Sequence, residues 1–323
     1  MKFINFLIIS VVSFQSFSTE LSIGLIEEIY LKSGTNERRI QIYYPYSKNV
    51  NNQTKFIIMN DGEELFSEND SWNGKAWNID KAFKDLKTQK ENLNLVIIAI
   101  DSAKRINGNI LDETRRYAEY FPKESIKYID ENLKRSIYSN FIDSQKFNYQ
   151  DFVINKVIPS IEKKFDTKLN RDNLGIIGAS MGGLSALNMS IENPEIFGFV
   201  GCISTHWVGI KISEYLILPF RMKISGDEST TKAIQKYIKN NVSKLSSQKL
   251  YFDHGTVGLD SLYENPQNEI NKILLGSEIN FIYEVYPNHD HEPKFFGQRF
   301  KNILLNFICL LYTSDAADEV RSV

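Results

Sequence analysis

The chain has 323 residues, of which 42 % are hydrophobic and 24 % are charged, and its formal net charge is −2. This is the composition of a globular protein that can bury a sizeable core. The near-neutral charge and the scattered Lys and Arg residues argue against a nucleic-acid partner, which would require a basic patch or tail.

The N-terminus has the layout of a secretory signal peptide. Lys2 precedes an apolar stretch from Phe3 to Phe14, and the small residues Ser16 and Ser18 follow. We expect residues 1–18 to be cleaved, which predicts a secreted or periplasmic protein. The apolar stretch is too short to predict stable insertion in a membrane after cleavage.

Eight short segments carry the residue patterns of β-strands. The first two, residues 23–31 and 38–46, alternate apolar and polar positions, as half-buried antiparallel strands do. The other six are more continuously apolar, which indicates strands of a parallel sheet that are buried on both faces: 55–62, 94–101, 174–180, 197–204, 249–255 and 280–287.

Helical patterns alternate with these strands over residues 77–86, 149–165, 181–192, 230–240, 267–275 and 298–308. Pro159 should kink or interrupt the second of these helices. The polar segment 102–147 shows no clear hydrophobic period. We expect it to be either a long insertion that covers the functional site or an elaborate surface loop. The order of elements predicts one α/β domain over residues 19–308, with a mostly parallel central sheet, an antiparallel N-terminal start and helices on both faces.

The C-terminal segment 309–323 is interpreted as a tail foreign to the natural protein. Its sequence from Cys309 to Glu319, CLLYTSDAADE, looks like the translation of a sequencing-library adaptor. Without Cys309 the domain keeps one cysteine, Cys202, in an apolar strand. A cysteine there behaves as a small core residue, so no disulfide framework is expected.

The most distinctive motif is GASMG, residues 178–182, which matches the G-x-S-x-G pattern of a nucleophile elbow. In such an elbow a serine occupies a strained turn between a strand and a helix, and the glycines leave room for that turn. An apolar strand precedes Ser180, Gly183 adds further room, and a helical pattern follows at once. We therefore expect Ser180 to be a nucleophile, with an ordinary tight turn as the alternative.

A nucleophilic serine needs a base, and the base needs a group that orients it. In hydrolases with this elbow, the acid and then the histidine follow the serine, in loops after later strands. His289 and His291 follow the last predicted strand, while Asp253 lies close to the end of the strand before it and Asp260 lies in the loop beyond. The residues thus predict a Ser-His-Asp triad but leave both choices open.

Several blocks of the sequence resemble one enzyme family. They are IIMNDGEELF, RRYAEYFP, GIIGASMGGLSALNMSIENPEIFG, CISTHW, YFDHGTVGLD and YPNHDHEPKFFGQRF, and they lie between about residues 40 and 308. In these blocks the chain resembles the esterase D and enterochelin-esterase-like group of α/β-hydrolases, often called the putative esterase family. The resemblance implies an α/β-hydrolase fold and a serine esterase with Ser180 as nucleophile, and it favours Asp260 over Asp253 and His291 over His289.

Two backbone N–H groups should bind the oxyanion that forms during acyl transfer. One is that of Met181, which directly follows the nucleophile at the start of a helix. The resemblance implies Glu63, the residue after Asp61 and Gly62, as the second. Because that contact uses the backbone, Glu63→Ala is expected to cost little activity.

Four further residues are candidates for a substrate pocket. His206 and Trp207 follow a strand end and should face the same rim as Ser180. Core packing fits an aromatic residue at this place equally well. The other two candidates, Asp61 and Tyr120, belong to the family-like blocks after the first parallel strand and in RRYAEYFP.

Three rival interpretations concern metal binding and the reaction itself. The loop NHDHE, residues 288–292, combines imidazole and carboxylate groups that suit zinc or manganese, although one loop rarely supplies all ligands. The scaffold could also carry an acyltransferase or a binding protein. The preferred hypothesis is a secreted or periplasmic serine esterase that acts on a small-molecule or carbohydrate-linked ester and needs neither a metal nor an organic cofactor.

Overall fold

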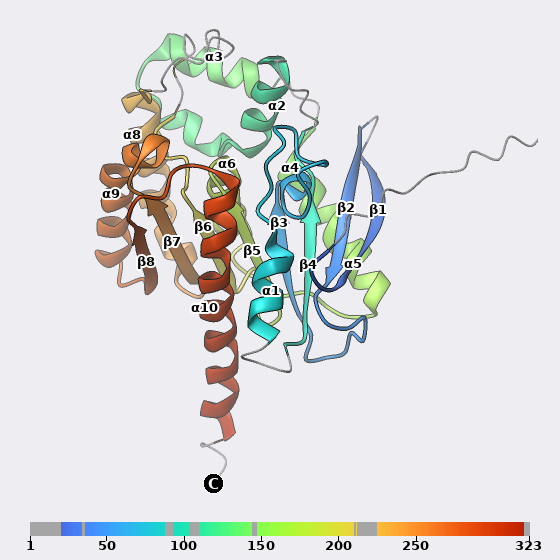
Figure 1. Ribbon diagram of the computed structural model, residues 1–323. Helices are drawn as coiled ribbons and strands as arrows, with labels where there is room; N and C mark the ends of the chain where they lie inside the picture. Colours follow the sequence, from blue (N-terminus) through green and yellow to red (C-terminus); the bar gives the residue numbers. More distant parts are fainter. Residues whose placement is uncertain are drawn as a thin grey trace, which may run out of the picture.

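The computed structural model describes residues 21–33, 36–87, 93–103, 110–143, 147–209, 211 and 225–319, and these form an α/β fold (Figure 1). The predicted signal peptide lies outside the described residues. Each of the eight segments predicted as strands overlaps a strand of one sheet, with the bounds β1 (Leu25–Ser33), β2 (Asn36–Tyr44), β3 (Lys55–Asn60), β4 (Leu95–Ile100), β5 (Leu174–Ala179), β6 (Phe199–Ile203), β7 (Lys249–Gly255) and β8 (Phe281–Tyr286).

The sheet is mixed, with the strand order β1-β2-β4-β3-β5-β6-β7-β8. β1 pairs antiparallel with β2, and β2 with β4, whereas all pairs from β4 to β8 are parallel. This confirms the predicted antiparallel start and mostly parallel centre. The prediction of burial on both faces is wrong for β8, because β8 is an edge strand whose side chains are only partly buried.

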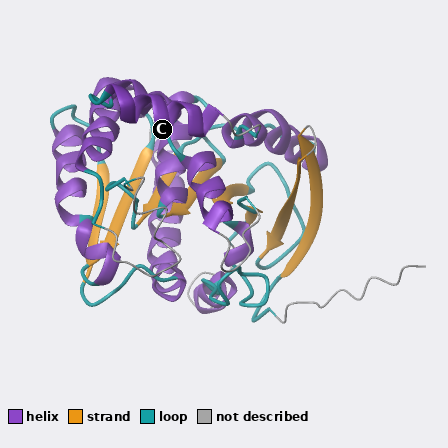
Figure 2. Cartoon of the chain, turned by 90° about the horizontal axis from the view of Figure 1, so that it is seen from above, coloured by secondary structure: helices purple, strands orange, loops and turns teal. Residues whose placement is uncertain are grey.

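Helices cover both faces of the sheet (Figure 2). One hydrophobic cluster contains residues of α5 (Ile158–Phe165), α6 (Met181–Glu192), α8 (Glu228–Asn241) and α9 (Glu264–Leu275). The other contains residues of α1 (Ile79–Lys87) and α10 (Pro293–Glu319), which lie side by side in front of the sheet in Figure 1. Short turns of 3₁₀-helix complete the fold, namely η1 (Gly62–Glu64), η2 (Lys123–Tyr128), η5 (Val242–Leu245) and η6 (Gly258–Leu262).

Pro159 does not interrupt its helix. α4 (Tyr149–Phe152) continues through a π-helical segment (Val153–Val157) into α5 without a break. Pro159 lacks an amide hydrogen and would clash with the carbonyl group four residues earlier in a regular helix. The π-helical segment alters the backbone pairing at that place, which is consistent with a continuous helix.

The segment predicted as a loop or insertion is largely helical. It contains α2 (Ile110–Tyr120), η2 and α3 (Asn132–Asp143), and α2 and α3 lie above the end of the sheet where α10 begins (Figure 1). The buried face includes the large side chains Tyr117, Tyr120 and Phe121. Because tyrosines make up much of this face, the segment had no clear apolar period in the sequence.

The long C-terminal helix α10 includes part of the segment predicted to be foreign, since it extends to Glu319. The foreign origin of residues 309–323 stays a prediction. Among the described residues, no helix combines the length and the apolarity needed to cross a membrane.

Candidate active site

The carboxyl ends of the parallel strands bring the predicted site residues to one edge of the sheet. Asp61 follows β3, Ser180 follows β5, and His206 lies three residues beyond the end of β6. Asp260 lies in η6 after β7, and His291 lies between β8 and α10. In open α/β sheets, this edge is where ligands bind.

Ser180 occupies a strained backbone conformation between β5 and α6, with φ 58° and ψ −124°. Its N–H donates to the carbonyl oxygen of Ile203 on β6 at 2.9 Å, which ties the turn to the sheet. A methyl group on Gly178 would lie 2.3 Å from the carbonyl carbon of Gly182. A methyl group on Gly182 would lie 2.8 Å from Oδ2 of Asp61. The glycines are therefore required by close contacts within and around the turn, as in a nucleophile elbow.

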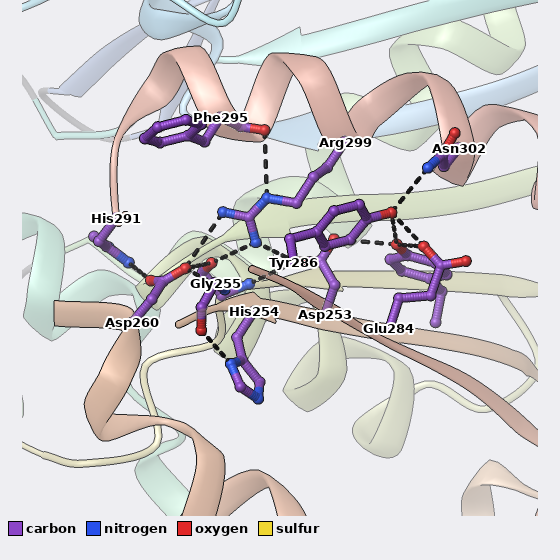
Figure 3. Close-up of polar contacts among 12 residues, drawn as sticks. Asp253, His254, Gly255, Asp260, Glu284, Tyr286, His291, Phe295, Arg299 and Asn302 are labelled. Carbon is purple, nitrogen blue, oxygen red and sulfur yellow. Dashed lines mark hydrogen bonds and ion pairs between the residues drawn. The ribbon is translucent and has the colours of Figure 1, made fainter. Parts of the chain in front are cut away.

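Asp260 and His291 point toward each other and form a short hydrogen bond (Figure 3). Nδ1 of His291 lies 2.6 Å from Oδ1 of Asp260. The other carboxylate oxygen accepts from the Gly255 amide at 2.7 Å and from the Ser204 hydroxyl at 2.6 Å. Burial raises the pKa of Asp260, but the hydrogen bond and charge of His291, with help from Ser204 and Arg299, outweigh burial and lower this pKa to about 2. Asp260 is thus a buried carboxylate that holds the Nδ1 atom of the imidazole.

The other candidate acid, Asp253, has a different partner. Arg299 of α10 donates from Nη1 to Oδ1 of Asp253 at 2.7 Å and from Nη2 to Oδ2 of Asp260 at 3.3 Å (Figure 3). The side chains of all three residues are fully buried. Burial raises the pKa of Asp253 to about 6, although Arg299 opposes this effect. The structure therefore pairs Asp260 with a histidine and Asp253 with an arginine.

The other candidate base, His289, is stacked between two aromatic rings. Its ring centroid lies 4.5 Å from that of Phe295 and 5.4 Å from that of Tyr286. Burial lowers the pKa of His289, and the nearby charge of Arg299 acts in the same direction. The histidines of the NHDHE loop therefore have different surroundings. In the described parts of the chain, no group of three or more His, Cys, Asp or Glu residues could hold a metal ion.

The two predicted oxyanion donors lie in η1 and at the start of α6. Met181 is the first residue of α6, and the first amides of a helix have no acceptor within that helix. Glu63 is the second residue of η1, and the residue before this turn, Asp61, has a left-handed backbone conformation. The Glu63 carboxylate accepts from the amide of Ser102 at 2.9 Å and also from its hydroxyl. The side chain of Glu63 thus anchors the turn, a contact that the sequence did not suggest.

Asp61 is held by an arginine that sequence reasoning missed. Arg116 of α2 donates from Nε and Nη2 to the two carboxylate oxygens of Asp61 at 2.6 and 2.7 Å. Both side chains are largely buried. The hydroxyl of the buried Tyr120 accepts from the Asp61 amide at 3.2 Å. Arg116 belongs to the family-like block RRYAEYFP, but the sequence alone did not identify Asp61 as the partner of its charge.

The aromatic candidates after β6 are both buried. Trp207 is 1 % exposed, belongs to the core, and donates from its indole N–H to Gln267 at 2.8 Å. These contacts are those of core packing rather than of a pocket floor. Nδ1 of His206 lies 2.9 Å from the hydroxyl of Tyr263, a fully buried residue that the sequence analysis did not single out.

Comparisons with known sequences give one family and partial relatives. The model of the family described as "Putative esterase" matches residues 32–302. An endo-1,4-beta-xylanase/feruloyl esterase of Xylanibacter ruminicola is 31 % identical over 101 residues, which are 29 % of this chain and 14 % of that protein. The uncharacterized protein YbbA of Bacillus subtilis is 25 % identical over 172 residues, which are 53 % of this chain and 58 % of that protein. The chain therefore matches less than two thirds of either relative.

Solved structures share the fold at low sequence identity. A ferulic acid esterase superposes with a TM-score of 0.60 at 15 % identity, covering 87 % of this chain and 96 % of that one. The enterobactin esterase FES of Shigella flexneri gives 0.57 at 16 % identity, with 90 % and 61 % covered. The enterobactin and salmochelin hydrolase IroE gives 0.56 at 17 % identity, with 88 % and 95 % covered.

Proposed function

The chain belongs to the Putative esterase family, and we propose that it is a serine esterase that hydrolyses carboxylic esters through an acyl-enzyme. The observation that carries this proposal is the 2.6 Å hydrogen bond between Asp260 and His291, at the sheet edge where Ser180 occupies its strained turn. A buried carboxylate that fixes a histidine near such a serine is the arrangement that activates a hydroxyl nucleophile.

In the proposed mechanism, the Ser180 oxygen attacks the ester carbonyl carbon while His291 takes the hydroxyl proton at Nε2. Asp260 holds Nδ1 of the imidazole and stabilises the imidazolium that forms. The N–H groups of Met181 and Glu63 bind the oxyanion. When the tetrahedral intermediate collapses, the carbon–oxygen bond to the alcohol breaks and His291 returns the proton to the alcohol. Water then repeats the sequence on the acyl-enzyme and releases the acid.

For the substrate, we infer an ester with a phenolic or catechol acyl group. Two structural neighbours are named for such compounds, ferulic acid and enterobactin. On this chain, the aromatic side chains of Tyr117, Tyr120 and Tyr263 cluster around the proposed site, and the guanidinium of Arg116 lies over the ring of Tyr120 at 5.1 Å. These rings are almost fully buried, so the inference of an aromatic acyl group rests on the two neighbours and not on a pocket lined by these side chains. We expect a higher kcat/KM for methyl ferulate than for methyl hexanoate.

For the location, we propose export from the cytoplasm. The support is the N-terminal pattern of Lys2, an apolar stretch and small residues up to Ser18. Recovery of the protein from culture medium or periplasm with an N-terminus at Thr19 would agree with export. An uncleaved chain found only in the cytoplasm would contradict it.

The activity is tested by labelling the purified protein with a fluorophosphonate probe, which reacts with activated serines. We expect the wild type to be labelled, and labelling to be lost in Ser180→Ala and in His291→Ala. His289→Ala is the matched control and should keep its labelling. Loss in His289→Ala with retention in His291→Ala would transfer the role of base to His289. A folded wild type that is not labelled and hydrolyses none of the esters would refute the proposal.

A further inference from the structure

Tyr263 contacts two histidines of the candidate site. It lies between η6 and α9, three residues after Asp260, and is fully buried. Its hydroxyl is 2.9 Å from Nδ1 of His206. Its ring centroid is 5.6 Å from that of His291, with an angle of 78° between the ring planes. The phenol therefore packs edge-on against the proposed base while its hydroxyl points to a different histidine.

Tyr263 and His206 also lie next to the nucleophile Ser180. The amide of His206 donates to the carbonyl oxygen of Ser180 at 3.1 Å, so the backbones of these residues are tied together. Burial raises the pKa of Tyr263 well above its usual range and the charge of Asp260 adds to this effect, whereas the side chain of Ser180, which lies beside the phenol, acts in the opposite direction through a hydrogen bond. Tyr263 is thus a neutral phenol beside the serine that would attack the ester.

The direction of these hydrogen bonds depends on the charge state and the tautomer of His206. Burial lowers the pKa of His206 to about 3, and the charges of His291 and Arg116 contribute in the same direction. The imidazole is therefore neutral at neutral pH and has one ring nitrogen that can accept. If Nδ1 accepts the phenolic proton, the Tyr263 oxygen keeps its lone pairs for the proton of Ser180.

We propose that Tyr263, supported by His206, is a positioning residue that holds the Ser180 hydroxyl beside the His291 imidazole. The inference rests on the proposed function, because it concerns the same nucleophile. A serine hydroxyl rotates freely unless a partner fixes it, and a nucleophile gains much of its rate from a fixed position relative to its base. Tyr263 would supply this fixation before the substrate arrives.

The chain offers a matched control for removal of the hydroxyl. Tyr283 of β8 donates to or accepts from Nε2 of His254 at 2.8 Å, which is also a tyrosine–histidine bond, although a partly buried one. In the described part of the chain, the hydrogen bonds and ring contacts of Tyr283 and His254 do not include Ser180 or His291. Tyr283→Phe therefore removes an equivalent hydrogen bond without touching the nucleophile.

The test measures the rate of fluorophosphonate labelling, together with kcat and KM for an ester that the wild type hydrolyses. For Tyr263→Phe we expect labelling and kcat to fall about tenfold, the rate equivalent of one neutral hydrogen bond, with KM unchanged. Tyr283→Phe should keep the wild-type rates. His206→Asn retains an acceptor near the position of Nδ1 and should stay within about threefold of wild type. His206→Leu should match Tyr263→Phe and add nothing to it in the double variant.

Thermal melts show whether each variant is folded before its rate is compared. Wild-type labelling rates in folded Tyr263→Phe and His206→Leu would overturn the inference and leave the esterase proposal intact. A raised KM with unchanged kcat would also overturn it, because Tyr263 would then bind substrate rather than position Ser180. A wild type that is not labelled at all would instead refute the proposed function.

Discussion

Replacing the buried Asp253 by asparagine should stabilise the protein at neutral pH, although it removes one partner of Arg299. Two effects oppose each other here. Breaking a buried ion pair commonly costs about 3–5 kcal/mol, because a charge is left unpaired. Arg299, however, also contacts Asp260 and the Ser204 hydroxyl, so the guanidinium keeps a carboxylate partner after the change.

The magnitude follows from the pKa of Asp253, which burial raises from the ordinary 3.8 to about 6 against the opposing charge of Arg299. One pKa unit corresponds to about 1.4 kcal/mol, so ionised Asp253 costs the folded state about 3 kcal/mol. Below pH 3.8 the carboxyl group is protonated in both states and this cost is absent. As the pH rises from 3.8 to about 6, the unfolded chain loses the proton first, and the free energy of unfolding falls.

Urea unfolding at pH 4, 5, 6 and 7, followed by circular dichroism, measures this dependence. Asp253→Asn should unfold with nearly the wild-type free energy at pH 4 and with about 3 kcal/mol more at pH 7. Asp260→Asn is the control of opposite sign, because His291 lowers the pKa of Asp260 to about 2 against the effect of burial. That variant should lose about 2 kcal/mol at pH 7, a difference that disappears as the pH falls through about 2. If Asp253→Asn were several kcal/mol less stable than wild type at pH 7, the reasoning would be wrong, and Arg299 would need both carboxylates.

Three further changes test the structure around the nucleophile. Gly178→Ala places a methyl group 2.3 Å from the backbone of Gly182. Labelling by the fluorophosphonate probe should become at least tenfold slower in the folded protein, and an unchanged rate would argue against a tightly packed elbow. Glu63→Ala removes the acceptor of two Ser102 hydrogen bonds and should lower the free energy of unfolding in urea by about 1–3 kcal/mol, while probe labelling continues. A loss of labelling comparable to that of Ser180→Ala would contradict a role of Glu63 through its backbone. Arg116→Met removes both hydrogen bonds to the buried carboxylate of Asp61 and should lower the free energy of unfolding by about 3–5 kcal/mol. A decrease below 1 kcal/mol in urea unfolding would be evidence against this pairing as a stabilising contact.

The sheet could be predicted because its signal is local. A buried strand of a parallel sheet needs a short run of apolar residues, and each of the eight predicted segments overlaps a strand. The start of α6 at Met181 follows from the same local logic, since the glycines permit the turn at Ser180. The exception is β8, where an apolar run lies at the edge of the sheet and not in its centre.

The helices α2 and α3 could not be predicted in this way. The inner face of α2 includes Tyr117 and Tyr120, and one of its arginines, Arg116, is largely buried through its pairing with Asp61. Such residues read as polar in the sequence, and the partner that makes their burial possible lies 55 residues away. A buried polar network is specified by long-range contacts, and periodicity does not record them.

Long-range contacts also decide which of the two acids, Asp253 or Asp260, pairs with the histidine, and these contacts come from one helix of the fold. Both carboxylates are fully buried, so burial does not distinguish them. The distinction comes from α10, which carries Arg299 to Asp253 and begins two residues after His291, the partner of Asp260. Phe296 and Phe300 pack α10 into the hydrophobic cluster on its face of the sheet. The docking of this one helix therefore fixes the arginine and the histidine together, and a helix displaced along its axis would change the partners of both acids at once.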